Sequence, residues 1–509
     1  MCWFTGTYSQ RKNKKLESIF NEAIKKIKHR GKYQVIWNYW EYNIWYHRLK
    51  TDINGIAIKE ESYIENIVFN GIIYNVQDLK QMFHLSESNN FDTLVIKAWY
   101  KKSGIKFLEK LRWMFTFAYN DEKNIHLIRD TIWIKPLYYV LWKWIFAFSS
   151  EMKWLTIFCR EYRLEIIEVL PGEIIKYNKA NWLITKEKFY YKRCNKLDWF
   201  KLLQESFSTS LIAPTLEYMQ GEKEIAILLS WWLDSSILLY SLFQNQQIDK
   251  RRIKVFCLSI TWSSDRKATK IIEEDLGIQV NYIEPFSAED SISKIEEVVR
   301  ITESPLARVV KVWILQYSLA QKIREQKIDI VISWEWSDEI FYWYKRFYKD
   351  IKNEKMIPTL FSNFFENIFF YTLLQRLDRV FSHFTIESRV PFLDQELVSW
   401  VEGMKIENKL HGWKNKYILR EYARHIWLPE SIVQREKEKM TKWVTKQENN
   451  YTQNLCGYLE NICYDYSGEY LSDICLKYYK KYYYQEDTNV HSQFEWFQTE
   501  QDIELLFDK

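Results

Sequence analysis

The chain has 509 residues, of which 47% are hydrophobic, and 72 basic against 67 acidic residues give a formal net charge of +5. This length predicts two or more domains. Because basic and acidic residues are nearly equal in number, the charge gives no indication of a nucleic-acid partner. No apolar run reaches transmembrane length, no signal peptide opens the chain, and the seven cysteines show neither CxxC pairs nor zinc spacing. We therefore expect a cytoplasmic protein with no membrane partner.

Residues 1–195 are predicted to form a first domain, made mostly of β-strands. Short apolar runs predict strands at 67–70, 114–120, 125–128, 137–141 and 145–148, and a final hairpin that ends near residue 191. Two segments, 78–85 and 93–111, have helical patterns. This pattern predicts an α+β domain of two layered antiparallel sheets with helices outside them.

Residues 196–509 are predicted to form a second domain, in which strands and helices alternate. The expected strands are 225–229, 253–260, 280–283 and 328–333, and the expected helices are 235–243, 265–276, 294–302 and 311–326. Such alternation predicts an α/β doubly wound parallel sheet with its ligand at the carboxyl ends of the strands. The part from about residue 346 is predicted to be mainly helical, and its Lys/Tyr-rich segment 477–484 to be a solvated, partly packed helix.

The segment 224–239 carries the clearest functional signal. An apolar strand is followed by a hydroxyl-rich turn at 230–236 and then by a helix for which Asp234 is the expected N-cap. A strand, a tight turn and a helix N-terminus bind phosphate through backbone N–H groups and the helix dipole. The turn does not match the GxxxxGK[ST] P-loop.

This turn resembles the SGGxDSS pyrophosphate loop of ATP-pyrophosphatases, with Trp231 and Trp232 at its two glycine positions. Two indoles would fill the space that glycine leaves for phosphate, so either the loop is inactive or the written sequence is misleading. The chain has 24 Trp and only 12 Gly, and their sum is close to the usual glycine share of about 7%. Frequent Lys, Ile, Tyr and Asn suggest AT-rich coding. Our hypothesis is that the source reads UGA as glycine and that the gene was translated with UGA as tryptophan.

Ordered motifs extend the resemblance from residue 2 to about 445. In the first domain MCWFTG at the start resembles MCGIxG, FNGIIYN at 69–75 resembles FNGEIYN, and DTIWIKPLY at 130–138 resembles DxxGIKPLY. In the second, SWEWSDE at 333–339 resembles SGEGxDE, and ESRVPFLD at 387–394 closely matches EARVPFLD. The chain resembles the glutamine-dependent asparagine synthetases, in which an N-terminal-nucleophile glutaminase precedes an ATP-pyrophosphatase synthetase domain.

For the first domain the resemblance implies that Cys2 is the catalytic nucleophile. Removal of Met1 leaves the thiol beside its own α-amine, which can act as general base. Glutamine would form a γ-glutamyl thioester and release ammonia. The implied glutamine-binding residues are Arg48 for the substrate carboxylate, Asp92 for its α-amine, and Asn70 with the Gly71 N–H for the oxyanion hole. Ile72 replaces the usual Glu of NGE, which weakens the expected grip on the substrate.

For the second domain the resemblance implies ATP and Mg²⁺ as cofactors. The implied ATP-binding residues are Ser230, Trp231, Trp232, Leu233, Asp234, Ser235, Ser236, Ile260, Ser333 and Trp334. Asp234 and Asp338 are the expected Mg²⁺ carboxylates. Glu335 would handle proton transfer when ammonia attacks a β-aspartyl-adenylate, and Lys437 would stabilise charge at the adenylated centre. The ESRVPFLD segment is predicted to be mainly a buried turn, with Arg389 and Asp394 as candidates for the aspartate pocket.

Nine tryptophans fall at glycine positions of the family: Trp3, Trp113, Trp133, Trp231, Trp232, Trp262, Trp334, Trp336 and Trp343. Overpacking costs about 1–3 kcal/mol per site, so together they would rival a typical stability of about 5–15 kcal/mol. The neighbouring Ser, Asp, Glu and Leu residues of the motifs are intact. A coding artefact explains this pattern better than decay of an inactive copy.

The sequence thus predicts an ATP-dependent, glutamine-hydrolysing ligase that makes L-asparagine from L-aspartate. One alternative is an amidotransferase of the same architecture acting on another carboxylate, because residues 303–311 do not closely follow the asparagine-synthetase pattern. Another is a non-catalytic binding protein, if the tryptophans are literal. The expected partners are small molecules (glutamine, aspartate and ATP), and the resemblance is compatible with a homodimer.

Overall fold

The computed structural model describes most of the chain, with several gaps. The described residues are 2–9, 14–25, 33–39, 42–48, 66–84, 92–191, 198–220, 223–230, 232–259, 264–341, 374–404, 410–411, 414–435 and 471–483. The predicted domain boundary near residues 193–197 lies outside them. We refer to the described residues up to 191 as the N-terminal region and to those from 198 as the C-terminal region.

The N-terminal region is a sandwich of two antiparallel sheets, as predicted. One sheet has the order β2-β3-β1-β8-β7-β9, with β1 Cys2–Ser9, β2 Tyr33–Tyr39, β3 Tyr42–Arg48, β7 Tyr138–Trp142, β8 Ile145–Ser149 and β9 Ile167–Glu168. The other has the order β11-β10-β6-β5-β4, with β4 Ile67–Ile73, β5 Trp113–Asn120, β6 Asn124–Arg129, β10 Glu173–Asn178 and β11 Ile184–Lys188. Apolar side chains that alternate along these strands, among them Phe4, Val68 and Tyr177, form the core between the sheets.

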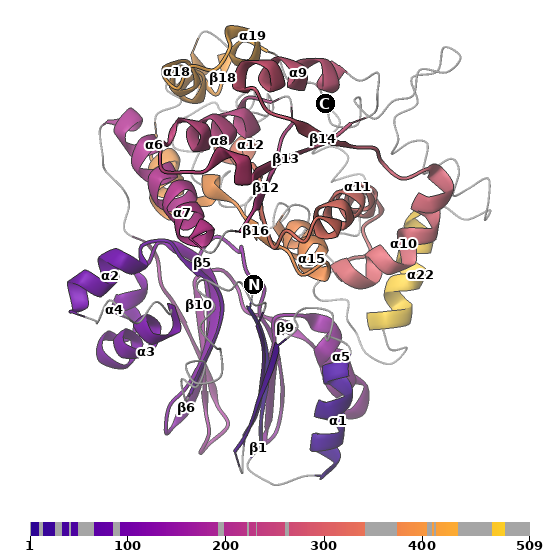
Figure 1. The fold of residues 1–509 in the computed structure, drawn as a ribbon. Helices are drawn as coiled ribbons and strands as arrows, with labels where there is room; N and C mark the ends of the chain where they lie inside the picture. The colour runs from indigo at the N-terminus through magenta and orange to yellow at the C-terminus, as the bar shows by residue number, and fades with distance from the viewer. Residues whose placement is uncertain are drawn as a thin grey trace.

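Helices cover the two outer faces of the sandwich (Figure 1). The helices α1 Lys14–Lys25 and α5 Met152–Tyr162 lie on one side, and α2 Val76–Phe83, α3 Asp92–Ser103 and α4 Ile105–Leu108 lie on the other. The sequence predicted one helix over 93–111. The structure divides it at Gly104, whose φ of 54° is a left-handed conformation that glycine tolerates well and that ends α3.

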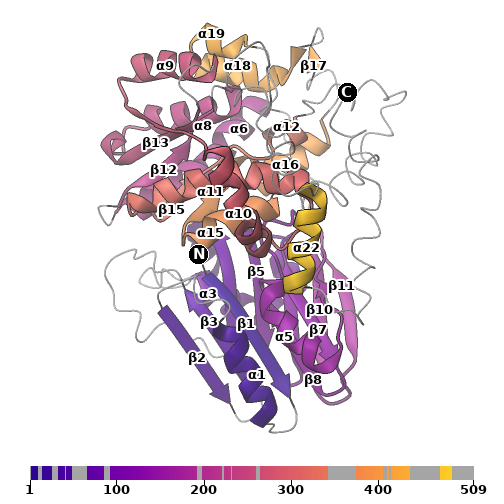
Figure 2. The same cartoon turned by 90° about the vertical axis from the view of Figure 1, so that its right-hand side faces the viewer.

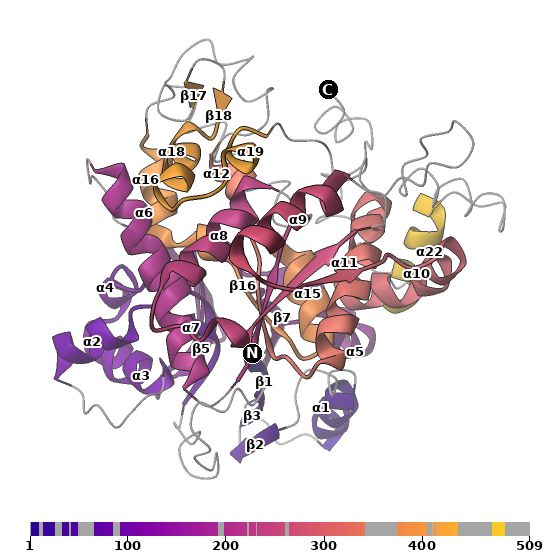
Figure 3. The ribbon, with the colours of Figure 1, turned by 45° about the horizontal axis from the view of Figure 1, so that its top comes forward.

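The C-terminal region is built on a five-stranded parallel sheet with helices on both faces, which confirms the predicted doubly wound class (Figure 3). Its order is β14-β13-β12-β15-β16, with β12 Ile225–Leu228, β13 Ile253–Leu258, β14 Val280–Ile283, β15 Ile330–Ile332 and β16 Glu387–Arg389. The helices around it are α6 Trp199–Phe207, α7 Ala213–Met219, α8 Leu233–Gln244, α9 Ser264–Leu276, α10 Ala288–Thr302, α11 Ala307–Glu325, α12 Ser337–Ile340, α15 Gln375–His383 and α16 Gln395–Glu402.

Strand β16 corrects the prediction for ESRVPFLD. This segment is not only a turn: its first three residues form the edge strand beside β15, and Pro391–Leu393 then make a short 3₁₀ turn into α16. The sequence signal was weak because Glu387 and Arg389 are charged. Both are buried in the strand, where they pair with each other at 2.9 Å.

The last described elements complete the C-terminal region. They are the hairpin β17 Leu410–His411 and β18 Lys414–Asn415, followed by α18 Tyr417–His425, α19 Glu430–Val433 and α22 Leu471–Tyr483. Helix α22 lies along α10 and also reaches α5 of the N-terminal region (Figure 2). Its residues Leu471, Ile474, Cys475 and Tyr479 are buried, which confirms the predicted partly packed helix.

The N- and C-terminal regions meet through buried polar contacts close to the start of β1. Ser150 N–H donates to the carbonyl of Phe4, and the carbonyl of Ser150 accepts from Arg379 of α15 at 2.9 Å. Lys135 Nζ lies 3.0 Å from a carboxylate oxygen of Asp378, also on α15. The first residues of β1 therefore lie near the junction of the two regions. None of the helices that the structure describes is long and apolar enough to span a bilayer.

Candidate functional site

The backbone of the N-terminal region brings the predicted glutaminase segments together. In the pairing of β1 with β3, Cys2 lies directly opposite Arg48, and β1 packs against β4, which carries Asn70 and Gly71. Asp92 is the first residue of α3. The side chains of Cys2, Arg48 and Asp92 lie outside the described part of the structure, so their roles remain predictions.

Asn70 and Gly71 have the features of a prepared polar site. The Asn70 side chain is fully buried, and neither its Nδ2 nor its Oδ1 has a hydrogen-bond partner among the described residues. Leaving a buried amide unpaired costs about 1–3 kcal/mol, so an amide without a protein partner is a candidate for binding a ligand. Gly71 has a φ of 152°, and a Cβ there would lie 2.0 Å from the carbonyl oxygen of Met114. Only glycine fits at this point of β4.

Ile72, which replaces the expected Glu, lies at the edge of the hydrophobic core of the C-terminal region. It pairs with Met114 across β4 and β5, and both residues join that core. An isoleucine cannot provide the carboxylate that the motif usually offers to a substrate amine. Its packing instead ties the strand of Asn70 to the C-terminal region.

The second group of predicted residues gathers at the switch point of the parallel sheet. The chain runs from β12 outward to β13 and β14, and then returns to place β15 on the other side of β12. Loops at the carboxyl ends of such adjacent strands diverge and leave a crevice for ligands. Ser230 follows β12 and Ser333 follows β15, so the two predicted ATP loops are neighbours.

Hydroxyl groups fix the shape of the 230–236 turn. Ser235 Oγ donates to the carbonyl of Ser230 at 2.7 Å, and Ser236 Oγ donates to the carbonyl of Trp232 at 2.8 Å. Ser230 Oγ lies 3.0 Å from Ser235 Oγ. These serines are buried, and they brace the backbone where α8 begins. The Leu233 side chain packs in the core, so any phosphate contact of this residue would come from its backbone.

The predicted N-cap role of Asp234 is wrong. Helix α8 begins at Leu233, its N-cap residue is Trp232, and Asp234 lies within the first turn. Trp232 provides no side-chain capping bond. The carboxylate of Asp234 instead contacts a group from a distant segment.

That group is Lys416, which sequence reasoning missed. Its Nζ lies 2.6 Å from Asp234 Oδ2 and 2.5 Å from Asp338 Oδ1, and Ser337 Oγ donates to Asp234 Oδ1 at 2.7 Å. The Lys416 side chain is 3% exposed. Burial lowers the pKa of its ammonium, and Asp234 opposes that shift. The sequence carried only a faint signal, a lysine just before an amphipathic helix.

Glu335 and its neighbours occupy the second loop. Ser333 is buried at the end of β15, and Trp334 is half-buried against the core. Glu335 Oε1 accepts a hydrogen bond from Gln316 Nε2 of α11 at 3.3 Å. The structure thus places Glu335 beside α11, on the loop that leads into α12, where Asp338 lies.

The two candidates for an aspartate pocket, Arg389 and Asp394, make structural contacts. Asp394 caps α16 by accepting from Leu397 N–H, and it forms a two-pronged ion pair with Arg112 of the N-terminal region. Arg389 pairs with Glu387 and donates to the carbonyl of Pro214. These contacts hold elements together, and the candidacy of both residues for an aspartate pocket stays a prediction.

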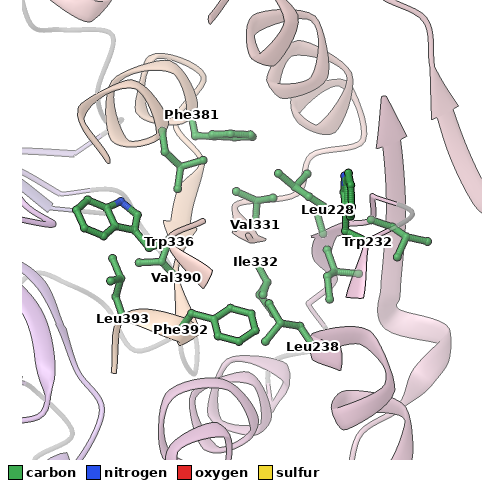
Figure 4. Close-up of a cluster of buried hydrophobic side chains, with 14 of the residues drawn as sticks. Leu228, Trp232, Leu238, Val331, Ile332, Trp336, Phe381, Val390, Phe392 and Leu393 are labelled. Atoms are coloured by element: carbon green, nitrogen blue, oxygen red, sulfur yellow. The ribbon is translucent and has the colours of Figure 1, made fainter. Parts of the chain in front are cut away.

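Two of the nine tryptophans at glycine positions, Trp133 and Trp336, have a backbone conformation that strains a bulky residue. Trp133 and Trp336 have φ values of 63° and 74°, which glycine adopts readily and bulky residues rarely do. The indole of Trp336 lies among Phe381, Val390 and Leu393, and Trp232 stands at the end of β12 (Figure 4). Among the described residues, twelve other than glycine have positive φ, and four of those are tryptophans, the other two being Trp182 and Trp427. Backbone geometry therefore agrees with glycine at these positions.

Three predicted site residues, Trp231, Ile260 and Lys437, lie outside the described residues. A cavity of about 1160 Å³ lies beside α3 and the β5–β6 turn. None of the predicted site residues lines it.

The residues present fit Mg²⁺ and a nucleoside triphosphate. Asp234 and Asp338 come from the first turns of two different helices, α8 and α12, and converge on one cationic atom, as two carboxylates around a single metal ion would. Helix α8 begins at the same crevice, where its N-terminal N–H groups and dipole favour phosphate.

Comparison with known proteins shows which protein families this chain resembles. A family model described as "Glutamine amidotransferase domain" matches residues 1–197, and one described as "Asparagine synthase" matches residues 211–367 and 352–471. A probable glutamine-hydrolysing asparagine synthetase of Acanthamoeba polyphaga mimivirus is 25% identical over 453 residues, which cover 83% of this chain and 81% of the relative. Asparagine synthetase B of Escherichia coli is 27% identical over 74% of this chain and 70% of its own. The asparagine synthetase of Cricetulus griseus is 26% identical over 86% of this chain and 84% of its own.

Proposed function

Since the chain belongs to the asparagine synthase family and has a glutamine amidotransferase domain before its synthase domain, we propose that it makes L-asparagine. The reaction would consume L-aspartate, L-glutamine and ATP and release L-glutamate, AMP and pyrophosphate. The observation that carries this proposal is the meeting of Asp234 and Asp338 beside the start of α8 at the switch point of the sheet. This is the place where an α/β sheet binds a nucleotide.

The first half of the reaction is glutamine hydrolysis. The Cys2 thiolate would attack the amide carbon of glutamine, after the free α-amine has taken its proton, and ammonia would leave as the thioester forms. Water would then release glutamate and free the thiol. The unpaired Asn70 amide and the Gly71 N–H would donate to the oxyanion in both steps, with Arg48 and Asp92 orienting the substrate.

The second half is activation and amidation of aspartate. A β-carboxylate oxygen of aspartate would attack the α-phosphorus of ATP and displace pyrophosphate, which the 230–236 turn and the N-terminus of α8 would hold. Ammonia would then attack the acyl carbon, AMP would leave, and Glu335 would accept a proton from the incoming nitrogen. Magnesium, when bound, supplies positive charge against the phosphate oxygens. Lys437 would stabilise charge at the adenylated carbon.

The protein that does this would carry glycine where the written sequence has tryptophan in its motifs. The positive φ values of Trp133 and Trp336 support this reading, because glycine removes the strain and opens the loops to substrate. The alternative, a non-catalytic binding protein, requires the tryptophans to be literal. Peptide mass spectrometry of the protein from its source separates the two, since peptides over residues 225–245 would read SGGLDSS in the first case.

The proposed function is tested with Cys2→Ala in a protein expressed with glycine at the UGA codons, which we call the glycine-decoded protein. We expect the variant to lose glutamine hydrolysis and glutamine-dependent synthesis, and to keep asparagine formation from ammonium and ATP, because the two chemistries use separate sites. Glutamate and asparagine release would be measured side by side. A variant that still hydrolyses glutamine would show that Cys2 is not the nucleophile.

The acceptor is tested by offering aspartate against other carboxylates with ammonium as the nitrogen source. Residues 303–311 are the reason for this test, because Glu303 is buried against Arg379 and is not open to an acceptor. AMP formation that depends on aspartate supports the proposal. Formation that depends on another carboxylate would keep the reaction class and replace the substrate.

A further inference from the structure

The two proposed magnesium ligands share a cation that belongs to the protein itself. Lys416 Nζ lies within 2.6 Å of oxygens from both Asp234 and Asp338, and it is 3.4 Å from the hydroxyl of Ser337. Ser337 donates that hydroxyl to the other oxygen of Asp234. A single ammonium thus bridges the first turns of α8 and α12, the helices that follow β12 and β15.

Electrostatics explain why an internal cation is needed there. The side chains of Asp234 and Asp338 are 2% and 14% exposed, and buried carboxylates are costly without a positive partner. Glu339, also buried, adds a third negative charge that acts on the same ammonium. Among the described residues, Lys416 is therefore a cation that balances these carboxylates.

The backbone of Lys416 indicates that its position is enforced. The residue has φ 56° and ψ 36°, a left-handed conformation that costs a lysine roughly 1–2 kcal/mol. It stands between β18 and α18, and its carbonyl accepts from Arg420 N–H. Strained conformations persist where the surrounding structure holds them, often at functional sites. Here the strained residue directs its side chain into the crevice.

We propose that Lys416 is a resident counter-cation of the magnesium site, and that its ammonium and Mg²⁺ occupy the space between Asp234 and Asp338 alternately. The assignment of these two aspartates as metal ligands rests on the proposed function. Mg²⁺ binds carboxylate oxygens at about 2.0–2.1 Å, so it would need the volume and the lone pairs that the ammonium uses. Two cations this close would also repel each other.

Because Mg²⁺ and the Lys416 ammonium exclude each other, binding of the metal should depend on binding of the nucleotide. Metal alone must displace Lys416 with no new anion to receive it. A nucleotide that arrives with the metal brings phosphate oxygens, to which the displaced ammonium can move. The metal site should therefore be weak without nucleotide, and each ligand should strengthen binding of the other.

The test is Mn²⁺ binding to the full chain without nucleotide, followed by electron paramagnetic resonance. We expect Lys416→Met to bind Mn²⁺ at least about 10-fold more tightly than the unmodified protein, a typical coupling for groups in one network. A folding defect would weaken binding, so a gain separates competition from a structural role. Equal or weaker binding by the folded variant would overturn the proposal.

Three controls sharpen this result. Lys416→Arg keeps the charge and should show no gain, and Asp338→Asn added to Lys416→Met should remove the gained site. Lys186→Met removes a half-exposed lysine of the N-terminal region and should change nothing. A gain in Lys416→Arg or Lys186→Met as large as in Lys416→Met would contradict the proposal.

If Lys416→Met does not fold, Lys416→Gln carries the same test, because its amide can still donate to one aspartate. In the unmodified protein, Mn²⁺ affinity with a non-hydrolysable ATP analogue is compared with the affinity for Mn²⁺ alone. Equal affinities would also overturn the proposal. These assays contain neither aspartate nor glutamine, so a failure of asparagine synthesis would leave their outcome unaffected.

Discussion

At the scale of single residues, backbone conformation separates the tryptophans into two groups. Trp182 and Trp427 have φ values of 64° and 61°, and both side chains are exposed, at 41% and 82%. Trp427 follows the C-cap of α18, a position where glycine is strongly favoured. Trp99, in contrast, lies inside α3 and stacks on Phe107. The first group has the conformation of glycine and the second does not.

Trp182→Gly and Trp427→Gly should each raise the free energy of unfolding by about 0.5–1 kcal/mol. Glycine relieves a left-handed strain of roughly 1–2 kcal/mol, and its greater freedom in the unfolded chain offsets part of that gain. Neither change opens a cavity, because both indoles are exposed. Urea unfolding measures the difference. The control Trp99→Gly should destabilise, by about 1 kcal/mol or more; equal effects at all three positions would contradict the assignment.

Glu335 is the residue whose substitution separates the two steps of synthesis. Glu335→Gln keeps the shape of the side chain but removes its ability to take a proton. Asparagine formation should fall by about 10²–10⁴-fold, the usual worth of general acid–base assistance. ATP–pyrophosphate exchange with aspartate should fall much less, because the 230–236 turn carries that step. Equal losses in both assays would assign Glu335 to binding or folding. Gln316→Ala, which removes its hydrogen-bond partner, is the matched control and should have the smaller effect.

At the scale of elements, short ends of strands and helices hold the site in place. The carboxyl ends of β12 and β15 carry the two loops proposed to bind phosphate, and β16 supports β15 from its other side. Asp394 begins α16 directly after β16, and it joins this part of the C-terminal region to Arg112, just before β5. Arg112 therefore links β5, the strand that pairs with β4, to the C-terminal region that carries the proposed nucleotide site.

Arg112→Met should lower the free energy of unfolding by about 1–3 kcal/mol, because it leaves the fully buried carboxylate of Asp394 without its charged partner. The N-cap bond to Leu397 would remain. Glu396→Gln is the matched control: Glu396 also contacts Arg112, at 3.3 Å, but it is 36% exposed and should contribute about 0–1 kcal/mol. Equal losses from the two variants in urea unfolding would show that the Asp394 pair contributes no more than a surface pair.

At the scale of the whole molecule, a buried ion network joins the N- and C-terminal regions. Arg379 of α15 lies 2.6 Å from Glu303, at the end of α10, and 3.5 Å from Glu151, which precedes α5. Lys153 contacts both carboxylates, at 3.6 Å and 2.7 Å. All four side chains are buried. Since opposite charges from both regions meet in this buried network, each region supplies charged partners for buried side chains of the other.

Arg379→Met should destabilise the protein by about 3–5 kcal/mol, since one buried cation is lost and two carboxylates remain. The substitution weakens the contact between the N- and C-terminal regions, so the two regions should unfold separately. We therefore expect calorimetry to resolve two unfolding transitions, one for each region. Arg324→Met is the control, because Arg324 pairs with Asp329 within the C-terminal region and both are partly exposed. It should cost about 0–1 kcal/mol and leave the number of transitions unchanged. A single, equally shifted transition in both variants would contradict the role of the network.

The sequence by itself determined the two fold classes, most strand and helix positions and the family. These follow from local rules: apolar periodicity, turn residues and motifs whose members lie within about ten residues of each other. Composition also raised the question of the tryptophans. Local patterns misjudged details that depend on what packs nearby, such as the start of α8 and the strand β16.

Only the tertiary structure decided which side chains meet. Lys416 lies 182 residues from Asp234 in the chain, and Arg112 lies 282 residues from Asp394. Pairings at such separations leave no periodic trace in a single sequence, because they depend on how whole elements pack. The same holds for the sign of φ at Trp133 and Trp336, which the surrounding chain imposes and the residue type opposes. The sequence named the two aspartates, and the packing of α18 against α8 brought a lysine between them.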